Sequence, residues 1–308
     1  MGIARNLLLY ASKNPWLRET FPRYQFARKA VRRFMPGEDV GAAIKAASAF
    51  QPDGITAVLT YLGENVADAQ QAGVVTNHYC DVLNMISDAG IKCELSVKLT
   101  QLGHDINTDL SFKNILRVAE VATRTKNYLW IDMEESKYVD STLALYRKLH
   151  VEHQNTGVCL QSYLYRTADD LKSLIPLRPG IRLVKGAYRE PPDRAFPKKS
   201  DVDENFFTLS EVLLDAAKRG QARPGFATHD PKLVERIQQK AQRDGVPPNS
   251  YEFQMLYGIR TEALRSLVRS GHSCRILISY GPAWFPWYMR RLAERPANVL
   301  FVLKHVWS

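Results

Sequence analysis

The fold is indicated by a short apolar run, Lys92-Cys93-Glu94-Leu95-Ser96-Val97-Lys98-Leu99, which has the length and composition of a β-strand. Runs of the same kind recur at residues 54–61, 128–133, 158–161, 181–185, 225–228, 251–256 and 274–279. Longer amphipathic stretches separate them, as in repeated βα units. Eight such strands with helical segments between them predict an α/β protein with the architecture of a (β/α)8 TIM-like barrel.

The segments between the strands differ in character. Residues 68–89 and 232–244 show the spacing of apolar and charged residues that is typical of helices. Residues 190–205 are rich in Pro, Lys and Asp and predict a long loop after the fifth strand, where barrels often place binding residues. We expect two parts, a basic amphipathic helical segment over residues 1–36 and a catalytic barrel over residues 37–308.

The composition is that of an ordinary globular protein, with 45% hydrophobic and 24% charged residues in 308. No apolar run approaches the roughly 18 residues that span a bilayer, and the chain begins without a secretory signal pattern, so we expect a cytoplasmic protein. Four widely spaced cysteines form no CxxC, and no metal site is predicted. These cysteines are Cys80, Cys93, Cys159 and Cys274, and we interpret three of them as buried small hydrophobes.

The net charge of +10 is concentrated partly in residues 1–36, where eight basic residues accompany the single acid Glu19. Apolar residues such as Leu8, Trp16 and Phe21 are interleaved with the charges, which favours a helix lying on something apolar. We expect this segment to pack against the protein's own core. The alternative is a peripheral contact with the inner face of a membrane. Nucleic acid is not expected as a partner.

Several predicted strands end in charged or hydrogen-bonding side chains rather than in apolar ones. These residues are Lys98, Asp132, Gln161, Lys185, and His229 with Asp230. The carboxyl ends of barrel strands meet on one face, and burying such a group there is costly unless it has a partner. A binding site explains the set, although for any one residue a structural salt bridge is an equal alternative.

Two adjacent arginines, Arg290 and Arg291, follow the aromatic run Trp284-Phe285-Pro286-Trp287-Tyr288. Arginine can bind both oxygens of a carboxylate at once, so the pair suits a small anionic substrate. The alternative is a solvated pair on an amphipathic helix. The sequence has no GxGxxG, GxxxxGK[ST], HExxH or GxSxG motif, so dinucleotide loops, P-loops, zinc proteases and hydrolase elbows are not supported.

Seven segments, in order, carry a resemblance to the monofunctional bacterial proline dehydrogenase family. The first four are Tyr61-Leu62-Gly63-Glu64-Asn65-Val66, Ser96-Val97-Lys98-Leu99-Thr100, Ile131-Asp132-Met133-Glu134-Glu135 and Arg182-Leu183-Val184-Lys185-Gly186-Ala187-Tyr188. The others are Ala227-Thr228-His229-Asp230, Glu252-Phe253-Gln254-Met255-Leu256-Tyr257-Gly258 and the Arg290-Arg291 run. Seven ordered motifs from about residue 40 to the end are far more specific than one.

The resemblance implies a distorted (β/α)8 barrel, with additional N-terminal helices, that binds FAD non-covalently at the carboxyl ends of its strands. Such enzymes oxidise L-proline to Δ1-pyrroline-5-carboxylate by hydride transfer to flavin N5, the first step of proline catabolism to glutamate. They pass the electrons to a membrane quinone. We expect any further oxidation of pyrroline-5-carboxylate to reside in a separate pyrroline-5-carboxylate dehydrogenase.

The resemblance also implies roles for individual residues. Catalytic roles fall to Lys98, Asp132 and Arg182, of which the first two resemble an ion pair beneath the substrate and the third an arginine near flavin N5. Substrate contacts fall to Glu64, Lys98, Leu256, Leu277, Trp287, Arg290 and Arg291, with Glu64 pairing Arg290 to close the site. Cofactor contacts fall to Asp132, Gln161, Arg182, Val184, Gly186, Ala187, Tyr188, Lys198, Lys199, Thr228, His229, Gln254, Arg291 and Glu294.

Two positions depart from the family pattern. Leu277 and Trp287 stand where the family is expected to have tyrosines, unless a shift of one residue brings Tyr280 or Tyr288 into those places. The departures leave a second hypothesis open, a paralogue that oxidises hydroxyproline or another cyclic amino acid. A third hypothesis, from a different class, is a basic barrel that binds nucleic acid or a membrane without redox activity.

Overall fold

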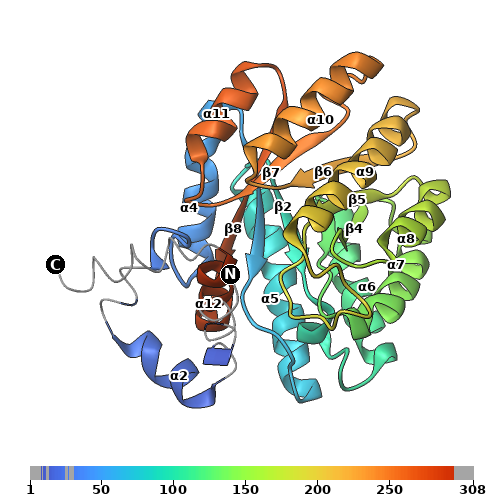
Figure 1. Ribbon diagram of the computed structural model, residues 1–308. Coiled ribbons are helices and arrows are strands. Elements are labelled where there is room, and N and C mark those ends of the chain that lie inside the picture. Colours follow the sequence, from blue (N-terminus) through green and yellow to red (C-terminus); the bar gives the residue numbers. More distant parts are fainter. Residues whose placement is uncertain (1–7, 9, 12–13, 25–26, 28–30, 295–308) are drawn as a thin grey trace.

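Eight parallel strands close into a barrel in chain order, with β8 paired to β1 (Figure 1). The computed structural model describes residues 8, 10–11, 14–24, 27 and 31–294. The strands are β1 Thr56–Tyr61, β2 Cys93–Val97, β3 Leu129–Ile131, β4 Thr156–Gln161, β5 Gly180–Val184, β6 Arg223–Ala227, β7 Glu252–Leu256 and β8 Ser273–Tyr280. Each overlaps one of the predicted runs, so the predicted barrel is confirmed.

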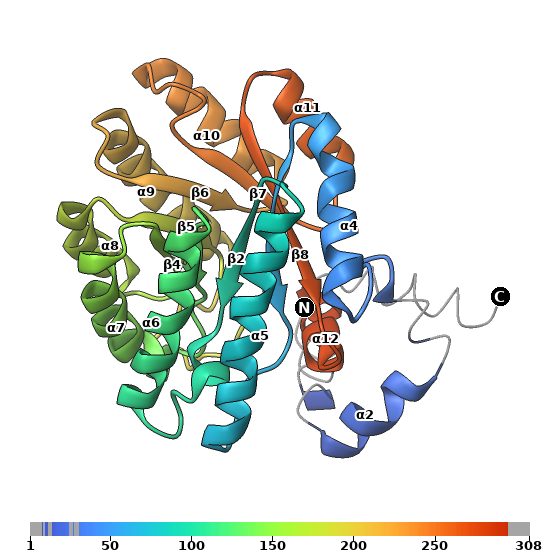
Figure 2. The ribbon, with the colours of Figure 1, turned by 180° about the vertical axis from the view of Figure 1, so that it is seen from behind.

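Helices follow the strands around the outside of the barrel (Figures 1 and 2). The α-helices are α2 Pro15–Thr20, α4 Val40–Phe50, α5 Ala69–Asp88, α6 Thr108–Arg124, α7 Val139–Glu152, α8 Thr167–Leu174, α9 Lys199–Lys218, α10 Pro231–Asp244, α11 Thr261–Arg269 and α12 Trp284–Glu294. Short 3-10 turns cover η1 Phe21–Arg23, η2 Gln51–Asp53, η3 Leu99–Leu102, η4 Ser136–Tyr138 and η5 Ile175–Leu177.

Local sequence signals explain the two helices that were predicted. The side chain of Asp68 caps α5 by accepting a hydrogen bond from the backbone N–H of Gln71 at 2.8 Å. Asp230 caps α10 in the same way, Pro231 occupies its first turn, and Gly245 ends it with a φ of 66°. The predicted helices over residues 68–89 and 232–244 are therefore confirmed.

The predicted loop over residues 190–205 is wrong in its second half, because α9 begins at Lys199. The first turn of this helix is polar and exposed, so its composition resembles that of a loop. An aspartate in that turn, Asp201, is favourable at the positive end of the helix dipole. The helix then buries Phe206 and Leu209 against the barrel wall.

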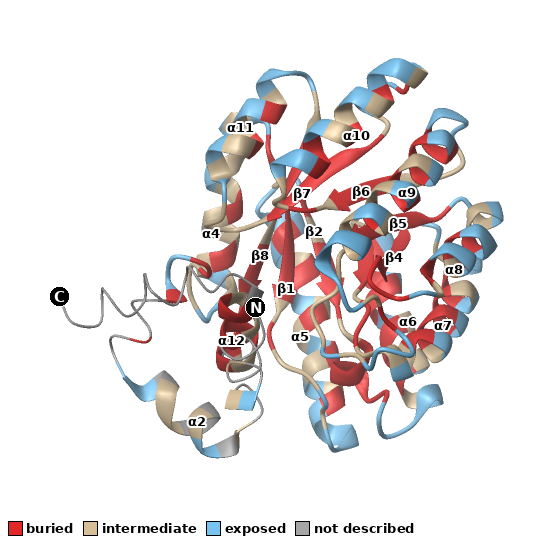
Figure 3. Cartoon of the chain, viewed as in Figure 1, coloured by how far each residue is buried: buried red, intermediate tan, exposed pale blue. Residues whose placement is uncertain are grey.

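Alternate residues of each strand face opposite sides of the barrel wall. Outward side chains form the main apolar core with the helices, and the exposed faces lie on the outer helical ring (Figure 3). Inward side chains of β2 are Glu94 and Ser96, and Lys98 continues the same side. The register of the sheet places Arg182 of β5 beside Gly225 of β6, and Gly225 beside Glu252 of β7.

A second apolar cluster joins the amino-terminal part of the chain to α12. Its buried members are Ala27, Val31, Phe34, Met35, Leu62, Trp284, Phe285, Trp287, Tyr288, Met289 and Leu292, with Leu8, Ala11, Leu17, Phe21 and Ile259 packed against them. The rings of Phe21 and Phe285 lie 5.1 Å apart. The amino-terminal segment therefore packs on the protein's own core where the structure describes it, as expected.

Three further expectations concern membranes, cysteines and metals. Within the described part of the chain, no helix has the length and apolar character needed to cross a membrane. Cys93, Cys159 and Cys274 are buried free thiols, which confirms the interpretation of three cysteines as buried small hydrophobes, and Cys80 is a half-buried free thiol. Among the same residues no group of His, Cys, Asp and Glu is arranged to hold a metal ion.

Candidate active site

The carboxyl ends of β2 and β3 place Lys98 against Asp132, with Nζ 2.8 Å from Oδ2. Asp132 also accepts hydrogen bonds from Ser96 Oγ at 2.7 Å and from Arg182 Nη1 at 3.0 Å. Burial opposes both charges, but the attraction to Lys98 and Arg182 outweighs it and lowers the pKa of Asp132. Burial alone would lower the pKa of Lys98, but the nearby carboxylates of Asp132 and Glu64 outweigh this effect and raise it. The pair is therefore charged at neutral pH.

Arg182 lies deeper, inside the barrel, with 2% of its surface exposed. Its Nε donates to Gln254 Oε1 at 2.8 Å, and its Nη1 donates to Ser96 Oγ at 2.9 Å as well as to Asp132. The buried Nη2 has no hydrogen-bond partner among the described residues. An unsatisfied buried donor costs about 1–3 kcal/mol. A bound group with an acceptor atom would remove that cost, so the arrangement fits a ligand above Arg182.

Arg290 of α12 pairs with Glu64, which follows β1. Nη2 and Oε1 are 2.7 Å apart and Nη1 and Oε2 are 3.2 Å apart, so the pair is bidentate. The hydroxyl of Tyr188 donates to Glu64 Oε1 at 3.2 Å, and its ring lies 5.5 Å from the Arg290 guanidinium. Arg291 follows on the helix and is half-buried. The predicted Glu64–Arg290 pair is thus present.

The segment after β5 supplies a partly accessible run of residues. Val184, Gly186, Ala187 and Tyr188 are half-buried, whereas most of β5 is fully buried. Gly186 has a φ of 112°, and a Cβ there would lie 2.4 Å from an atom of the Tyr163 ring. Only glycine fits this position without displacing the ring. The backbone can therefore approach a ligand closely along this run.

Two further predicted residues have fixed amide or ring orientations. Gln161 Nε2 donates to the carbonyls of Met133 and Glu134 at 3.3 and 3.1 Å, and its buried Oε1 has no partner among the described residues. His229 Nε2 accepts from the backbone N–H of Leu256 at 2.9 Å. The neutral ring of His229 therefore carries its proton on Nδ1. Thr228, the residue before it, is buried.

The two lysines predicted to meet a diphosphate differ in their surroundings. Lys199 forms ion pairs with Asp203 and, at 3.5 Å, with Asp230. Lys185 shares the same two carboxylates at 2.6 and 3.2 Å. Lys198 occupies the N-cap position of α9, where its side chain makes no capping hydrogen bond, and it is exposed. The structure therefore brings Lys199, but not Lys198, into a defined ionic cluster. The side chain of the last predicted residue, Glu294, lies outside the described residues.

The two positions that depart from the family pattern occupy different environments. Leu277 faces the barrel interior in register with Leu256 and Val58, and both leucines are half-buried. They form an apolar wall at the carboxyl end of the barrel. Trp287 is instead a member of the second apolar cluster, with 8% of its surface exposed. Its contact with a substrate ring stays a prediction.

For the alternative of a one-residue shift, the geometry speaks against Tyr280, whereas the role of Tyr288 stays a prediction, as does that of Trp287. The hydroxyl of Tyr280 lies 2.9 Å from Nε2 of His78 on α5, so this ring lies outside the barrel wall. Tyr288 is fully buried in the second cluster, with its ring 6.0 Å from that of Phe34. Leu277 is the member of this stretch of β8 that faces inward next to Leu256.

Sequence reasoning missed a set of inward-facing polar residues. These are Glu94, Ser96, Trp130, Glu134, Arg223, Glu252 and Arg275. The sequence did hold one signal for them, because residues two apart in a strand lie on the same face. Ser96 therefore faces the same side as Lys98, and Glu252 the same side as Gln254. Glu134 accepts hydrogen bonds from Thr100, and burial raises its pKa to about 7.

Comparisons with known proteins agree with this geometry. A sequence model of the family described as proline dehydrogenase matches residues 43–304. Proline dehydrogenase 1 of Bacillus subtilis subsp. natto is 35% identical over 302 residues, which cover 98% of each chain. Proline dehydrogenase of Deinococcus radiodurans is 36% identical over 277 residues, 88% of each chain.

A solved structure supports the fold alone. Proline utilization A (PutA) from Bdellovibrio bacteriovorus, inactivated by N-propargylglycine, superposes with a TM-score of 0.81 at 22% identity. The match covers 94% of this chain and 36% of that one, so the present chain spans about a third of the PutA polypeptide. With a family match over most of its length and relatives that align nearly end to end, the chain is an enzyme of the proline dehydrogenase family.

Proposed function

We propose that this barrel oxidises L-proline to Δ1-pyrroline-5-carboxylate with non-covalently bound FAD. The observation that carries the proposal is the buried Nη2 of Arg182, a donor without a partner among the described residues, below the Lys98–Asp132 pair. FAD, when bound, supplies a two-electron acceptor for the hydride that leaves proline C5. The residues proposed to hold it are Asp132, Gln161, Arg182, Val184, Gly186, Ala187, Tyr188, Lys198, Lys199, Thr228, His229, Gln254, Arg291 and Glu294.

Arg290 and Arg291 are proposed to bind the carboxylate of proline. Two guanidinium groups on one helix can fix a carboxylate in orientation as well as position. The pairing of Arg290 with Glu64 ties α12 to the segment after β1, and Tyr188 joins this contact from the segment after β5. The three segments together would shield the reacting atoms from water once the substrate is in place.

Lys98 and Asp132 are proposed to act through their charges. The nitrogen lone pair of proline forms the C=N bond as the hydride leaves C5, so the amine must be neutral at that step. The raised pKa of Lys98 and the lowered pKa of Asp132 keep the pair ionised, which makes Lys98 a poor base. Lys98 therefore positions the substrate beside Asp132 instead of taking its proton.

The apolar wall of Leu256 and Leu277 favours a second candidate, a cyclic amino acid with a larger apolar ring than proline, as the better substrate. Neither side chain can donate a hydrogen bond to a ring substituent. The wider proposal also includes a membrane quinone as electron acceptor, a separate pyrroline-5-carboxylate dehydrogenase, and a cytoplasmic location with contact to the membrane surface. These last elements are supported by the family resemblance alone.

The test is an anaerobic titration of the purified flavoprotein with L-proline, hydroxyproline and larger ring analogues, followed by flavin absorbance. We expect bleaching with at least one of them, and the ratio of the rates identifies the preferred ring. A protein that binds FAD but is not bleached by any of these compounds would refute the assignment. Binding of nucleic acid without flavin would favour a binding protein instead.

A further inference from the structure

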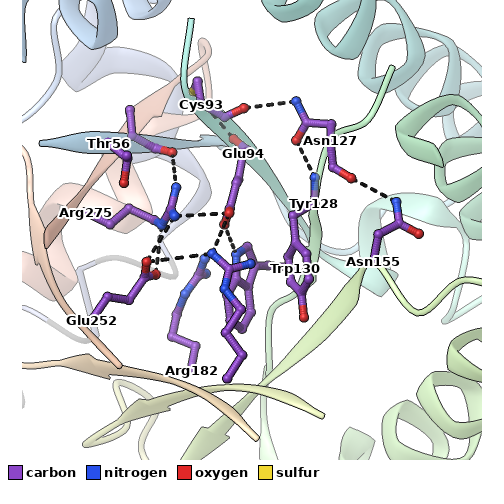
Figure 4. A network of polar contacts seen from close by, with 12 residues as sticks. Thr56, Cys93, Glu94, Asn127, Tyr128, Trp130, Asn155, Arg182, Glu252 and Arg275 are labelled. Atoms are coloured by element: carbon purple, nitrogen blue, oxygen red, sulfur yellow. Dashed lines mark hydrogen bonds and ion pairs between the residues drawn. The ribbon is translucent and has the colours of Figure 1, made fainter. Parts of the chain in front are cut away.

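Four charged side chains, of which Glu252 and Arg275 are buried, pair with one another inside the barrel near Arg182 (Figure 4). Arg275 donates to Glu252 through Nε at 2.8 Å and through Nη2 at 3.0 Å, and it pairs with Glu94 at 3.0 Å. Arg223 donates to Glu94 at 2.5 Å. Two carboxylates thus balance two guanidiniums, and we call these residues the lower charge cluster.

Gln254 connects the lower charge cluster to Arg182. Its Nε2 donates to Glu252 Oε1 at 2.5 Å, and its Oε1 accepts from Arg182 Nε at 2.8 Å. The orientation of this amide follows from chemistry, because an ionised carboxylate only accepts hydrogen bonds and a guanidinium only donates them. Burial opposes the charge of Glu252, but Arg275 and Arg223 hold its pKa at about 2. Glu252 is therefore ionised and only accepts hydrogen bonds at neutral pH.

The sheet leaves room for this connection at one residue. Arg182 is on β5 and Gln254 on β7, and Gly225 of β6 lies between these strands. A Cβ at Gly225 would lie 2.4 Å from Gln254 Nε2. The amide therefore occupies the space that a side chain of β6 would take. The contact between Gln254 and Arg182 depends on a glycine at this place.

We propose that Glu252 is a positioning residue for the oxidation, acting on Arg182 through the amide of Gln254. With Nε held by Gln254 and Nη1 by Ser96 and Asp132, the guanidinium plane is fixed and Nη2 is the donor left for a ligand. The inference rests on the proposed function, in which Arg182 lies beside the flavin. Loss of Glu252 lets the amide turn and present a donor to Arg182, which displaces the guanidinium.

Glu94 provides a matched control within the same cluster. It forms ion pairs with the same two arginines, and its side chain is about as buried as that of Glu252, with 14% and 10% exposed. Its remaining contact is with the indole N–H of Trp130 at 2.6 Å, not with Gln254. The guanidinium of Arg182 lies 4.7 Å from the centroid of the Trp130 ring. Because this contact is with the face of a bulky ring and not with a turning amide, we expect it to persist in Glu94→Gln.

The experiment compares Glu252→Gln with Glu94→Gln in the FAD-loaded enzyme by measuring the flavin midpoint potential. Each change removes one negative charge, which by itself favours the reduced flavin and raises the potential. Displacement of Arg182 has the opposite sign and is expected only in Glu252→Gln. We expect a tenfold fall in the reduction equilibrium of that variant, about 30 mV for a two-electron couple, and an unchanged or raised potential in Glu94→Gln.

The kinetic expectation for Glu252→Gln is a roughly tenfold lower kcat with an unchanged KM for proline, because the carboxylate clamp is not altered. Gly225→Ala is a second variant that changes no charge. Its added Cβ displaces the Gln254 amide, so its potential should fall as well. If Glu252→Gln does not fold, the potential of Gly225→Ala still tests whether the Gln254 amide positions Arg182.

Two outcomes would overturn the inference. Potentials that rise equally in both glutamine variants would show a bare charge effect, and an unaltered potential in Gly225→Ala would show that the amide does not position Arg182. The wild-type enzyme separates these outcomes from failure of the proposed function. If proline bleaches the wild-type flavin and the variants match it, only the role of Glu252 is wrong.

Discussion

The interior of the barrel holds two charged layers that differ in balance. The lower charge cluster pairs two carboxylates with two guanidiniums, and none of its buried polar atoms lacks a partner. Above it lies what we call the upper layer, Lys98, Asp132 and Arg182. Lys98 and Arg182 share the carboxylate of Asp132, and Arg182 retains a donor without a partner among the described residues. A balanced layer satisfies its own charges, so the loss of one member is costly, whereas a layer with surplus positive charge and an open donor is suited to an electron-rich ligand.

The largest effect is expected in the lower layer, from Arg275→Met. Removing this guanidinium leaves Glu252 and Glu94 buried with fewer cations, and breaking a buried pair in this way costs roughly 3–5 kcal/mol. The loss should be seen in the free energy of unfolding, measured by denaturant titration at neutral pH. A stability equal to that of the wild-type protein would mean that the cluster is not a structural unit.

The pH dependence of that stability has a defined sign. The folded-state pKa of Glu252 is about 2 against an ordinary value of 4.5, so its contribution is present above about pH 4.5 and is lost as the pH falls towards 2. Arg275→Met should remove most of this acid sensitivity. The difference in stability between variant and wild type should therefore shrink on acidification.

In the upper layer, Arg182→Met should affect the reaction more than the fold. Removing one positioned donor from a site of this kind typically lowers kcat by about a hundredfold to a thousandfold. Steady-state kinetics with proline measures the loss. Arg182→Lys keeps the charge without the planar group, so it should recover part of the rate. A large loss of stability with normal kinetics would assign Arg182 to the structural layer instead.

Glu134 lies next to the upper layer and offers a smaller, pH-dependent effect. Burial raises its pKa from 4.5 to about 7, so between these values the folded protein keeps a proton that the unfolded chain releases. Stability should consequently fall as the pH rises through this window, by about 3 kcal/mol. Glu134→Gln cannot ionise and should lose the dependence, as measured by unfolding from pH 5 to pH 8. Equal slopes in both proteins would contradict the shift.

The sequence predicts the upper layer better than the lower one. Lys98, Asp132 and Gln161 stand at strand ends, where a charged or amide side chain after an apolar run is conspicuous. Glu94 and Arg275 lie inside strands, and their pairing joins β2 to β8 across the barrel interior. That contact depends on closure of the sheet, which no local pattern shows. The start of α9 was also missed, because the first buried residue of this helix is Phe206 and the turns before it have the polar composition of a loop.

The smallest expected effect concerns the apolar wall at the mouth, where Leu277→Tyr adds bulk and a hydroxyl beside Leu256. Such contacts distinguish related substrates by about 1–3 kcal/mol, so the preference for proline over a larger ring analogue should rise roughly tenfold in kcat/KM. Ile278→Val is the control, because the next residue of β8 is buried on the outer side of the wall and should leave the preference unchanged. If Leu277→Tyr also leaves this preference unchanged, the ring of the substrate does not reach β8. The choice among cyclic amino acids would then have to depend on residues other than the apolar wall.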